Sequence, residues 1–416
     1  MLGISVRALR RTGLVAILTS TLLLGGGALA HTAVAQNAAT DDQGVGIGDF
    51  TFTPADTWVL AGKSVTWTNP IDPVEHTTTA VDGTWDSGPI ATGDQFTFAF
   101  DTPGDYPYYC SIHPQMTATV HVRATAAELP LAPLARVERL ADMVPPDVRA
   151  KGALQIATDA TYAPNEFIDP ADGQIKGWDI DFANAISTAL DLPSVISNAD
   201  FTSIIPNLGS RYDASFASFT PTAEREKTVD FVTYYQAGEA WFTRVGGPNV
   251  ASALDMCGKT VAVQTGTVEE SDAWGFMGKK PDGSAIPGDK DNCAANGRPP
   301  ITVHSFVKQT EANADLVGGR ADVGWADSPV ADYQVKLLPD QLNLAGSPCS
   351  VAPYGIALPK GSGMIPVFTE AVKWLIDNGY YDQILKKWNV ADGAIKSSAV
   401  ALNNNNTIGP TCVPSY

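Results

Sequence analysis

The stretch LQIATDATYAP at residues 154–164 decides the fold of most of this chain. Its first four residues, LQIA, predict a short strand. A helical pattern follows, because apolar residues recur every four positions at Trp178, Phe182, Ile186 and Leu190 and mark one face. A strand that leads into an amphipathic helix is the unit of an α/β fold with a parallel sheet.

The same alternation of strand and helix continues towards the C-terminus. Further strands are expected at 260–263 and 321–325, and a helical stretch over 364–388 breaks at Asn378-Gly379. We therefore expect an α/β domain over residues 148–396 that consists of two lobes with parallel sheets. The Asn-rich tail at 397–416 is expected to be loose except where Cys412 ties it down.

Residues 44–123 have an all-β pattern instead. Val65 and Trp67 alternate with polar neighbours, and turn signals recur at 61–62, 82–83 and 103–104. The segment therefore predicts a small β-sandwich. Residues 124–147 are rich in Ala, Leu and Pro, and we expect a linker there with at most one short helix.

The N-terminal 35 residues are typical of a signal peptide. Arginines precede a short apolar run at 14–24, and A-x-A cleavage sites follow at 28–30 and 33–35. We expect a periplasmic or secreted protein, exported by the general or the twin-arginine route. The absence of a cysteine near these cleavage sites argues against a lipoprotein, and the mature chain has no predicted membrane span.

Composition limits the classes of partner. The 416 residues are 44% hydrophobic and 17% charged, as in a globular protein of two or three domains. Lys and Arg number 27 against 45 Asp and Glu, which gives a net charge of −18. Such an acidic chain argues against binding to nucleic acid or to an anionic membrane surface.

Five cysteines leave one unpaired in an oxidising compartment. Cys110 has a histidine and a methionine within six residues, so we assign it to a metal and expect the other four to pair. Closeness in sequence favours the disulfides Cys257–Cys293 and Cys349–Cys412, and the two other pairings stay open.

The segment around Cys110 has the composition of a copper site. Cys110, His113 and Met116 offer a soft thiolate, an imidazole and a thioether on one short loop, and His76 is the candidate fourth ligand. Such donors suit copper, whereas structural zinc sites rarely use methionine. His121 and His304 are expected to be structural.

Residues 44–123 resemble the cupredoxins, in particular the amicyanin and pseudoazurin type. The likeness includes the ligand loop, the approach Pro103-Gly104-Asp105-Tyr106 and the segment Trp67-x-Asn69. It implies one type 1 copper ion and an electron-transfer role. By resemblance Asn69 would hydrogen-bond near the thiolate, and Glu75, where the family often has proline, would place a carboxylate beside His76.

A candidate anion site lies in the α/β region. Thr220 and Pro221 predict the start of a helix, as N-cap and first helical residue. Free N–H groups there, together with the Arg225 guanidinium, would suit a carboxylate. Asp159 and Asp327, at expected strand ends, are candidates to hold an ammonium.

Residues 150–392 resemble the polar amino-acid-binding family of ABC-importer solute-binding proteins. Blocks that carry the likeness, in order, are GWDIDF at 177–182, GKTVAVQTGT at 258–267, PYGIA at 353–357 and GYYDQI at 379–384. The resemblance implies a first lobe of about 148–245 and 350–396, a second lobe of about 248–348, and hinges near 243–248 and 348–353.

The resemblance also implies roles for individual residues. Arg225 would bind the ligand carboxylate with help from Ser218, Thr220, Thr267 and Val268. Asp327 would hold the ammonium, and Asp159 would face the side chain or amine. Tyr162 and Phe201 would sandwich the side chain, and Gln264 stands where some members carry lysine, which leaves the specificity open.

Three functions are compatible with the sequence. The first is an amino-acid receptor for an ABC permease with a fused blue-copper domain, and not an enzyme. The second is a redox carrier whose α/β domain docks or senses a partner protein. The third is a dehydratase-like enzyme, for which we see no clear catalytic acid.

Overall fold

The computed structural model describes residues 42–125 and 133–413. The expected signal peptide at 1–35 lies outside the described residues, as does part of the expected linker. Within the described residues, no helix is both long and apolar enough to cross a membrane.

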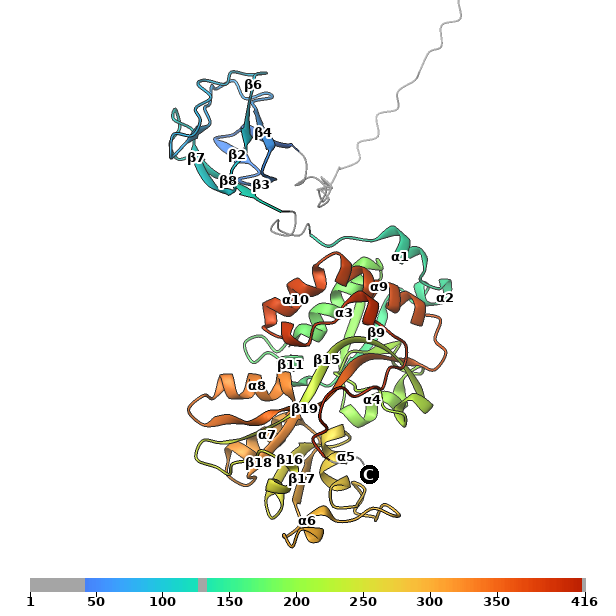
Figure 1. The fold of residues 1–416 in the computed structure, drawn as a ribbon. Helices are drawn as coiled ribbons and strands as arrows, with labels where there is room; N and C mark the ends of the chain where they lie inside the picture. Colours follow the sequence, from blue (N-terminus) through green and yellow to red (C-terminus); the bar gives the residue numbers. More distant parts are fainter. Residues whose placement is uncertain (1–41, 126–132, 414–416) are drawn as a thin grey trace, which may run out of the picture.

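Residues 43–123 form two four-stranded sheets (Figure 1). The sheet orders are β2-β1-β4-β6 and β3-β8-β7-β5. The bounds are β1 Gln43–Gly48, β2 Thr51–Thr53, β3 Asp56–Leu60, β4 Lys63–Thr68, β5 Thr79–Ala80, β6 Gln95–Phe100, β7 Gly104–Tyr109 and β8 Thr117–Arg123. Inward-facing aromatic residues, among them Trp67, Trp85, Phe100 and Tyr108, fill the space between the sheets. This is the β-sandwich that the alternating pattern predicts.

The larger part is a two-lobed α/β fold around one eight-stranded sheet, whose order is β13-β9-β14-β19-β15-β18-β16-β17. Its strands are β9 Leu154–Thr158, β13 Ser194–Asn198, β14 Ala214–Ser215, β15 Val229–Arg244, β16 Thr260–Gln264, β17 Thr302–Phe306, β18 Val323–Asp327 and β19 Leu342–Pro359. A separate ribbon contains β10 Thr161–Tyr162, β11 Glu166–Ile168 and β12 Ile175–Lys176. The neighbours of β9 and of β16 are parallel, whereas β15 and β19 run antiparallel through both lobes.

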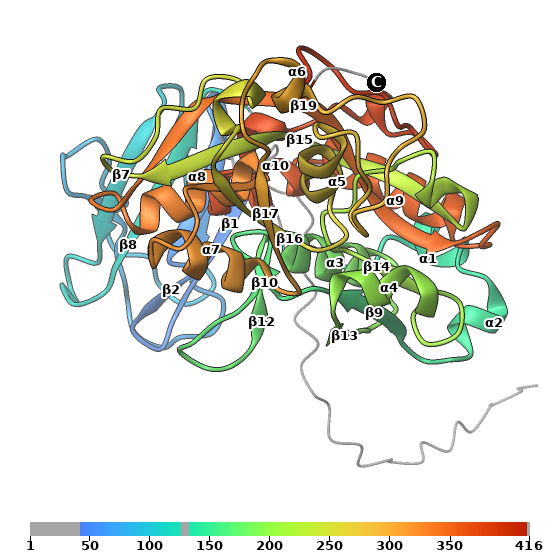
Figure 2. The same ribbon diagram turned by 90° about the horizontal axis from the view of Figure 1, so that it is seen from below.

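The helices cover the two halves of this sheet. They are α1 Glu138–Asp142, α2 Pro146–Arg149, α3 Trp178–Ala189, α4 Phe201–Asn207, α5 Val268–Gly275, α6 Asn292–Ala295, α7 Gln309–Val317, α8 Ser328–Leu337, α9 Ile365–Asp377 and α10 Tyr380–Trp388. Short 3₁₀ turns lie at Arg225–Lys227, Ala253–Met256, Ala391–Gly393 and Ser397–Ala399. Figure 2 views the molecule from the end of the second lobe, which carries α5 to α8. The expected break at Asn378-Gly379 separates α9 from α10, where Gly379 has a φ of 83°.

The first hinge lies earlier than the sequence predicts. On β15, Ala237 packs in the core of the first lobe and Trp241 in that of the second, so the crossing precedes the expected 243–248. The reason is that β15 runs on as one strand and pairs with β18 from Glu239 onwards. On β19 the crossing falls between Cys349 and Tyr354, as expected.

Two segments expected to lie outside the α/β domain, the linker and the loose tail, are packed in part against it. Leu140 and Val144, from the expected linker, are buried in the core of the first lobe. In the tail, Val400 joins the same core, and the Asn403 side chain accepts a hydrogen bond from Phe231 N–H and donates one to Asp230. Apolar residues in both segments cover helices and strands that solvent would otherwise reach.

The disulfides Cys257–Cys293 and Cys349–Cys412 form as the sequence spacing favours. Cys257–Cys293 lies within the core of the second lobe. Cys349–Cys412 links the tail covalently to β19. Cys110 remains free and is buried.

Candidate functional sites

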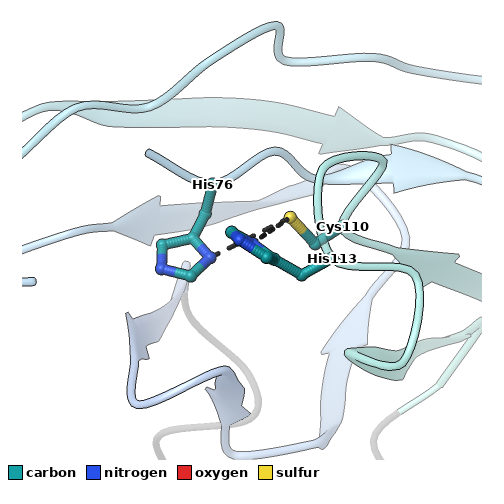
Figure 3. Close-up of side chains that lie close together, drawn as sticks. All are labelled: His76, Cys110 and His113. Atoms are coloured by element: carbon teal, nitrogen blue, oxygen red, sulfur yellow. Dashed lines mark hydrogen bonds between the residues drawn. The ribbon is translucent and has the colours of Figure 1, made fainter. Parts of the chain in front are cut away.

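Three of the four predicted metal ligands converge at one end of the β-sandwich (Figure 3). Cys110 follows β7, His113 lies in the turn before β8, and His76 lies on the loop between β4 and β5. The Cys110 Sγ atom is 3.9 Å from His76 Nδ1 and 3.6 Å from His113 Nδ1. Cys110 and His76 are fully buried, and His113 is half-buried.

These separations suit a shared metal ion. A thiolate bonded at about 2.3 Å and an imidazole at about 2.0–2.1 Å to one ion lie about 3.5–3.8 Å apart. Both histidines present the same nitrogen, Nδ1, to the sulfur. The donor set of one thiolate and two imidazoles therefore fits a soft or borderline transition-metal ion.

Met116, the fourth predicted ligand, closes the loop. Its side chain is buried, its carbonyl accepts a hydrogen bond from Cys110 N–H at 3.1 Å, and its N–H donates to the His113 carbonyl at 2.9 Å. The backbone of the loop is thus fixed at all three predicted ligand positions.

The groups that orient this cluster differ from those expected. The thiol sulfur accepts a hydrogen bond from Thr77 N–H at 3.3 Å, whereas Asn69 binds the carbonyls of Val74 and Ile90 and so fixes the loop before His76. The expected contact of Asn69 near the thiolate is therefore wrong.

The carboxylate beside the ligand is not Glu75, which is exposed, but Asp72. His76 Nε2 lies 3.2 Å from Asp72 Oδ2, so Nε2 carries the proton and the lone pair of Nδ1 faces the sulfur. Hydrogen bonds, first of all from Val74 N–H, lower the pKa of Asp72 and keep it ionised.

The second site is a cavity between the lobes with an empty volume of about 330 Å³. All ten residues predicted to bind the ligand line it, namely Asp159, Tyr162, Phe201, Ser218, Thr220, Arg225, Gln264, Thr267, Val268 and Asp327. Glu166, Ala217 and Glu269 line it too, and the sequence analysis missed them.

Arg225 supplies the positive charge of the cavity. Its guanidinium donates to the carbonyl of Thr220 in the first lobe and to that of Gly266 in the second, each at 2.8 Å. The guanidinium carbon lies over the rings of Phe201 and Phe219, at 5.4 and 5.3 Å from their centres. Burial lowers the pKa of Arg225 to about 10, so the side chain is charged at neutral pH.

The helix predicted to start at Thr220 and Pro221 does not form. Only a 3₁₀ turn follows, at Arg225–Lys227, because β15 begins at Val229 and leaves too few residues for a helix. The free N–H groups come instead from α5 in the second lobe, whose N-cap Thr267 accepts a hydrogen bond from Glu270 N–H at 3.2 Å. A helix start of this kind favours an anion.

Acidic groups line the same cavity. Asp327 ends β18, and Tyr162 Oη donates to its Oδ2 at 3.0 Å. Asp159 follows β9 and accepts hydrogen bonds from Gln264 Nε2 at 2.6 Å, Thr161 Oγ1 at 2.9 Å and Phe201 N–H at 3.1 Å. The Gln264 contact joins the two lobes. Burial raises the pKa of both carboxyls, to about 6 for Asp327.

Ser218 also lines the cavity. It has a φ of 52°, and its hydroxyl accepts from Asn165 Nδ2 at 2.9 Å and lies 3.4 Å from the buried carboxyls of Glu166 and Asp179. Burial raises the pKa of Glu166 well above its usual value. The cavity thus sets one guanidinium against four carboxyl groups, those of Asp159, Glu166, Glu269 and Asp327.

Comparisons with known proteins agree with this architecture. Residues 154–391 match the family model of bacterial extracellular solute-binding proteins, family 3. The arginine-binding protein ArgT of Corynebacterium glutamicum is 30% identical over 265 residues, which cover 64% of this chain and 83% of that protein. The L-arginine-binding protein of Pseudomonas aeruginosa is 30% identical over 253 residues, or 58% of this chain and 90% of that protein.

Solved structures show the same fold. A mutant of the arginine-binding protein of T. maritima has a TM-score of 0.51 and 30% identity, covering 60% of this chain and 99% of its own. An ancestral arginine-binding protein bound to arginine has a TM-score of 0.50 and 33% identity, covering 57% and 98%. These relatives are all named as binding proteins. The α/β part of this chain belongs to family 3 of the bacterial extracellular solute-binding proteins.

Proposed function

We propose that this protein is an exported receptor that captures an amino acid with a cationic side chain for an ABC permease. The observation that carries the proposal is the interlobe cavity, in which one guanidinium faces four carboxyl groups. A neutral zwitterion places only one ammonium among these four carboxyl groups, whereas a second cationic group on the ligand can pair with another of them. The relatives named as arginine-binding proteins support this ligand class.

The ligand would lie with its two charged ends apart. Its carboxylate binds Arg225 and the start of α5, and its ammonium binds Asp327. Its side chain extends between Tyr162 and Phe201 towards Asp159, and the lobes close over it about β15 and β19. Interlobe contacts from Gln264 and Arg225 already hold such a closed arrangement.

Calorimetry on the full chain tests this function. Arginine, lysine and ornithine should bind, and glutamate should not. Arg225→Ala should weaken binding at least about 30-fold, because the unpaired carboxylate costs about 2–5 kcal/mol. Lys227→Ala, an exposed position two residues on, should bind as the wild type does. If no basic amino acid produces heat with the wild type, the receptor function is wrong.

We further propose that the β-sandwich is a cupredoxin domain that binds one copper ion and passes single electrons to a partner protein. His76, Cys110, His113 and Met116 would hold the ion. The convergence of a thiol and two imidazoles in a two-sheet sandwich supports this proposal. Copper would supply one-electron redox chemistry, and the thiolate loop would hold it rigidly.

Titration with Cu²⁺ tests the copper proposal. The protein should bind one equivalent and become intensely blue, and Cys110→Ser should abolish the colour. His113→Asn should weaken binding, whereas His121→Asn, in the same sandwich but hydrogen-bonded to Asp105, should not. A colourless complex of the wild-type protein would contradict a blue-copper site.

A further inference from the structure

Glu269 is a buried acid that no sequence motif indicated. It is the second residue of α5, lines the interlobe cavity and is 1% exposed. Its Oε1 atom is buried and has no hydrogen-bond partner in the part of the chain that the structure describes. An unpaired buried oxygen is unfavourable unless a donor reaches it, and Glu269 lines the cavity in which a ligand would supply such a donor.

Glu269 also lies beside the acid that is expected to hold the ligand ammonium. Both carboxyl groups line the same cavity, and burial together with the negative charge of Asp327 raises the pKa of Glu269. Two buried carboxyl groups that interact in this way do not readily ionise together, because burial and the like charge both disfavour the second ionisation. The empty site therefore favours one shared proton over two adjacent negative charges.

We propose that Glu269 binds the ligand together with Asp327 and that their shared proton leaves when the amino acid binds. The inference rests on the proposed receptor function. An ammonium group has three donors, so it can reach Oε1 of Glu269 and the Asp327 carboxylate at once. Its positive charge then replaces the proton between the two acids.

The surroundings determine the direction of the pH effect. Charged or titratable groups near Glu269 and Asp327 come from α5 itself and from four other elements: Asp272 from α5, Arg225 from the 3₁₀ turn, Tyr162 from β10, Glu239 from β15 and Tyr354 from β19. Burial, followed by the charge of Asp327, raises the pKa of Glu269 well above its usual value. Ligand binding must expel the proton, so affinity rises with pH, up to about tenfold per pH unit while one proton leaves.

Calorimetry of arginine binding at pH 5.5 to 8, in two buffers of different ionisation enthalpy, measures the protons released. The wild type should release close to one proton per arginine near neutral pH, and its affinity should rise with pH. Glu269→Gln should release far less, bind at least about tenfold more weakly at pH 8, and show a flatter pH profile. Glu224→Gln, an exposed acid of the first lobe, should behave as the wild type does.

Two results would overturn the proposal. One is wild-type binding without proton release at any pH in this range, which needs no variant. The other is a folded Glu269→Gln protein that releases as many protons as the wild type. If no basic amino acid binds the wild type even at pH 8, the receptor function itself is wrong and this inference falls with it.

Discussion

Asp72 contacts both His76 and the turn at Asp49 and Phe50 through one oxygen atom. Its Oδ2 accepts from His76 Nε2 and from Asp49 N–H at 3.0 Å. Asp49 and Phe50 both have positive φ, 48° and 57°, a conformation that bulky residues rarely adopt. That turn places the Phe50 ring edge-on to His113, with 4.9 Å between ring centres. A single carboxylate thereby orients one histidine directly and supports the ring that covers the other.

Replacement of Asp72 by asparagine should weaken copper binding about 10- to 100-fold, because His76 loses the carboxylate that fixes its tautomer. Competition titration against a chelator of known affinity measures this change. Glu75→Gln is the matched control, since Glu75 precedes His76 but is exposed. This variant should bind copper as tightly as the wild type does. Equal affinities for Asp72→Asn and the wild type would show that the Asp72 contact does not orient the ligand.

Residue types at family spacings were sufficient to predict which side chains meet. All ten predicted ligand-binding residues line one cavity, and three of the four predicted metal ligands form one cluster. Glu269 and Asp72 were missed because their sequence context is ordinary. Glu269 follows a polar cap and precedes another glutamate, as exposed helix starts often do, and only the packing of α5 against the cavity buries it.

At the scale of secondary structure, local pattern predicted the strands near 154–157, 260–263 and 321–325 and the helices near 178–190 and 364–388, but not where the chain crosses between lobes. The crossing on β15 lies within a continuous run of buried residues, so nothing in the sequence interrupts it. The pairing of β15 with β19 is irregular between Ala237 and Trp241, and this irregularity depends on the partner strand. Likewise, the sequence of the tail has no pattern that predicts its packing, because the tail is held in place by contacts with β15 and β19.

The tail contributes to stability through the disulfide Cys349–Cys412, which closes a loop of 63 residues. A double serine variant at these positions should lower the free energy of unfolding by about 2–4 kcal/mol. Urea denaturation followed by tryptophan fluorescence measures the loss. Limited proteolysis should then cleave the variant within 397–413 while the wild type resists cleavage there. An unchanged free energy of unfolding and equal resistance would mean that the side-chain contacts of Asn403 and its neighbours hold the tail without the disulfide.

For the whole molecule, buried carboxyl groups in and near the cavity link stability to pH and to the ligand. Burial raises the pKa values of Asp179, Asp272 and Asp327 to about 6, above the value of about 4 for an unfolded carboxyl. The folded state therefore binds more protons than the unfolded state above pH 4. Stability from these groups is present below pH 4 and is lost as the pH rises through about 6. Below pH 4 the folded protein loses stability for the opposite reason. Carboxylates whose pKa is lowered by folding, such as Asp105 and Asp315, become protonated there.

The melting temperature of the ligand-free protein should accordingly fall by about 5 °C or more between pH 5 and pH 8, since one carboxyl shifted by two pKa units contributes up to about 2.7 kcal/mol. Saturating arginine should raise the melting temperature more at pH 8 than at pH 5, because the ionised cavity binds the cation more tightly. Differential scanning calorimetry measures both effects, and the transition that arginine moves is that of the two-lobed domain. Glutamate at the same concentration is the control and should move neither transition. A melting temperature that rises from pH 5 to pH 8 without ligand would contradict this prediction. It would mean that the buried carboxyl groups are ionised in the folded protein, and a permanently bound cation would then have to balance their charge.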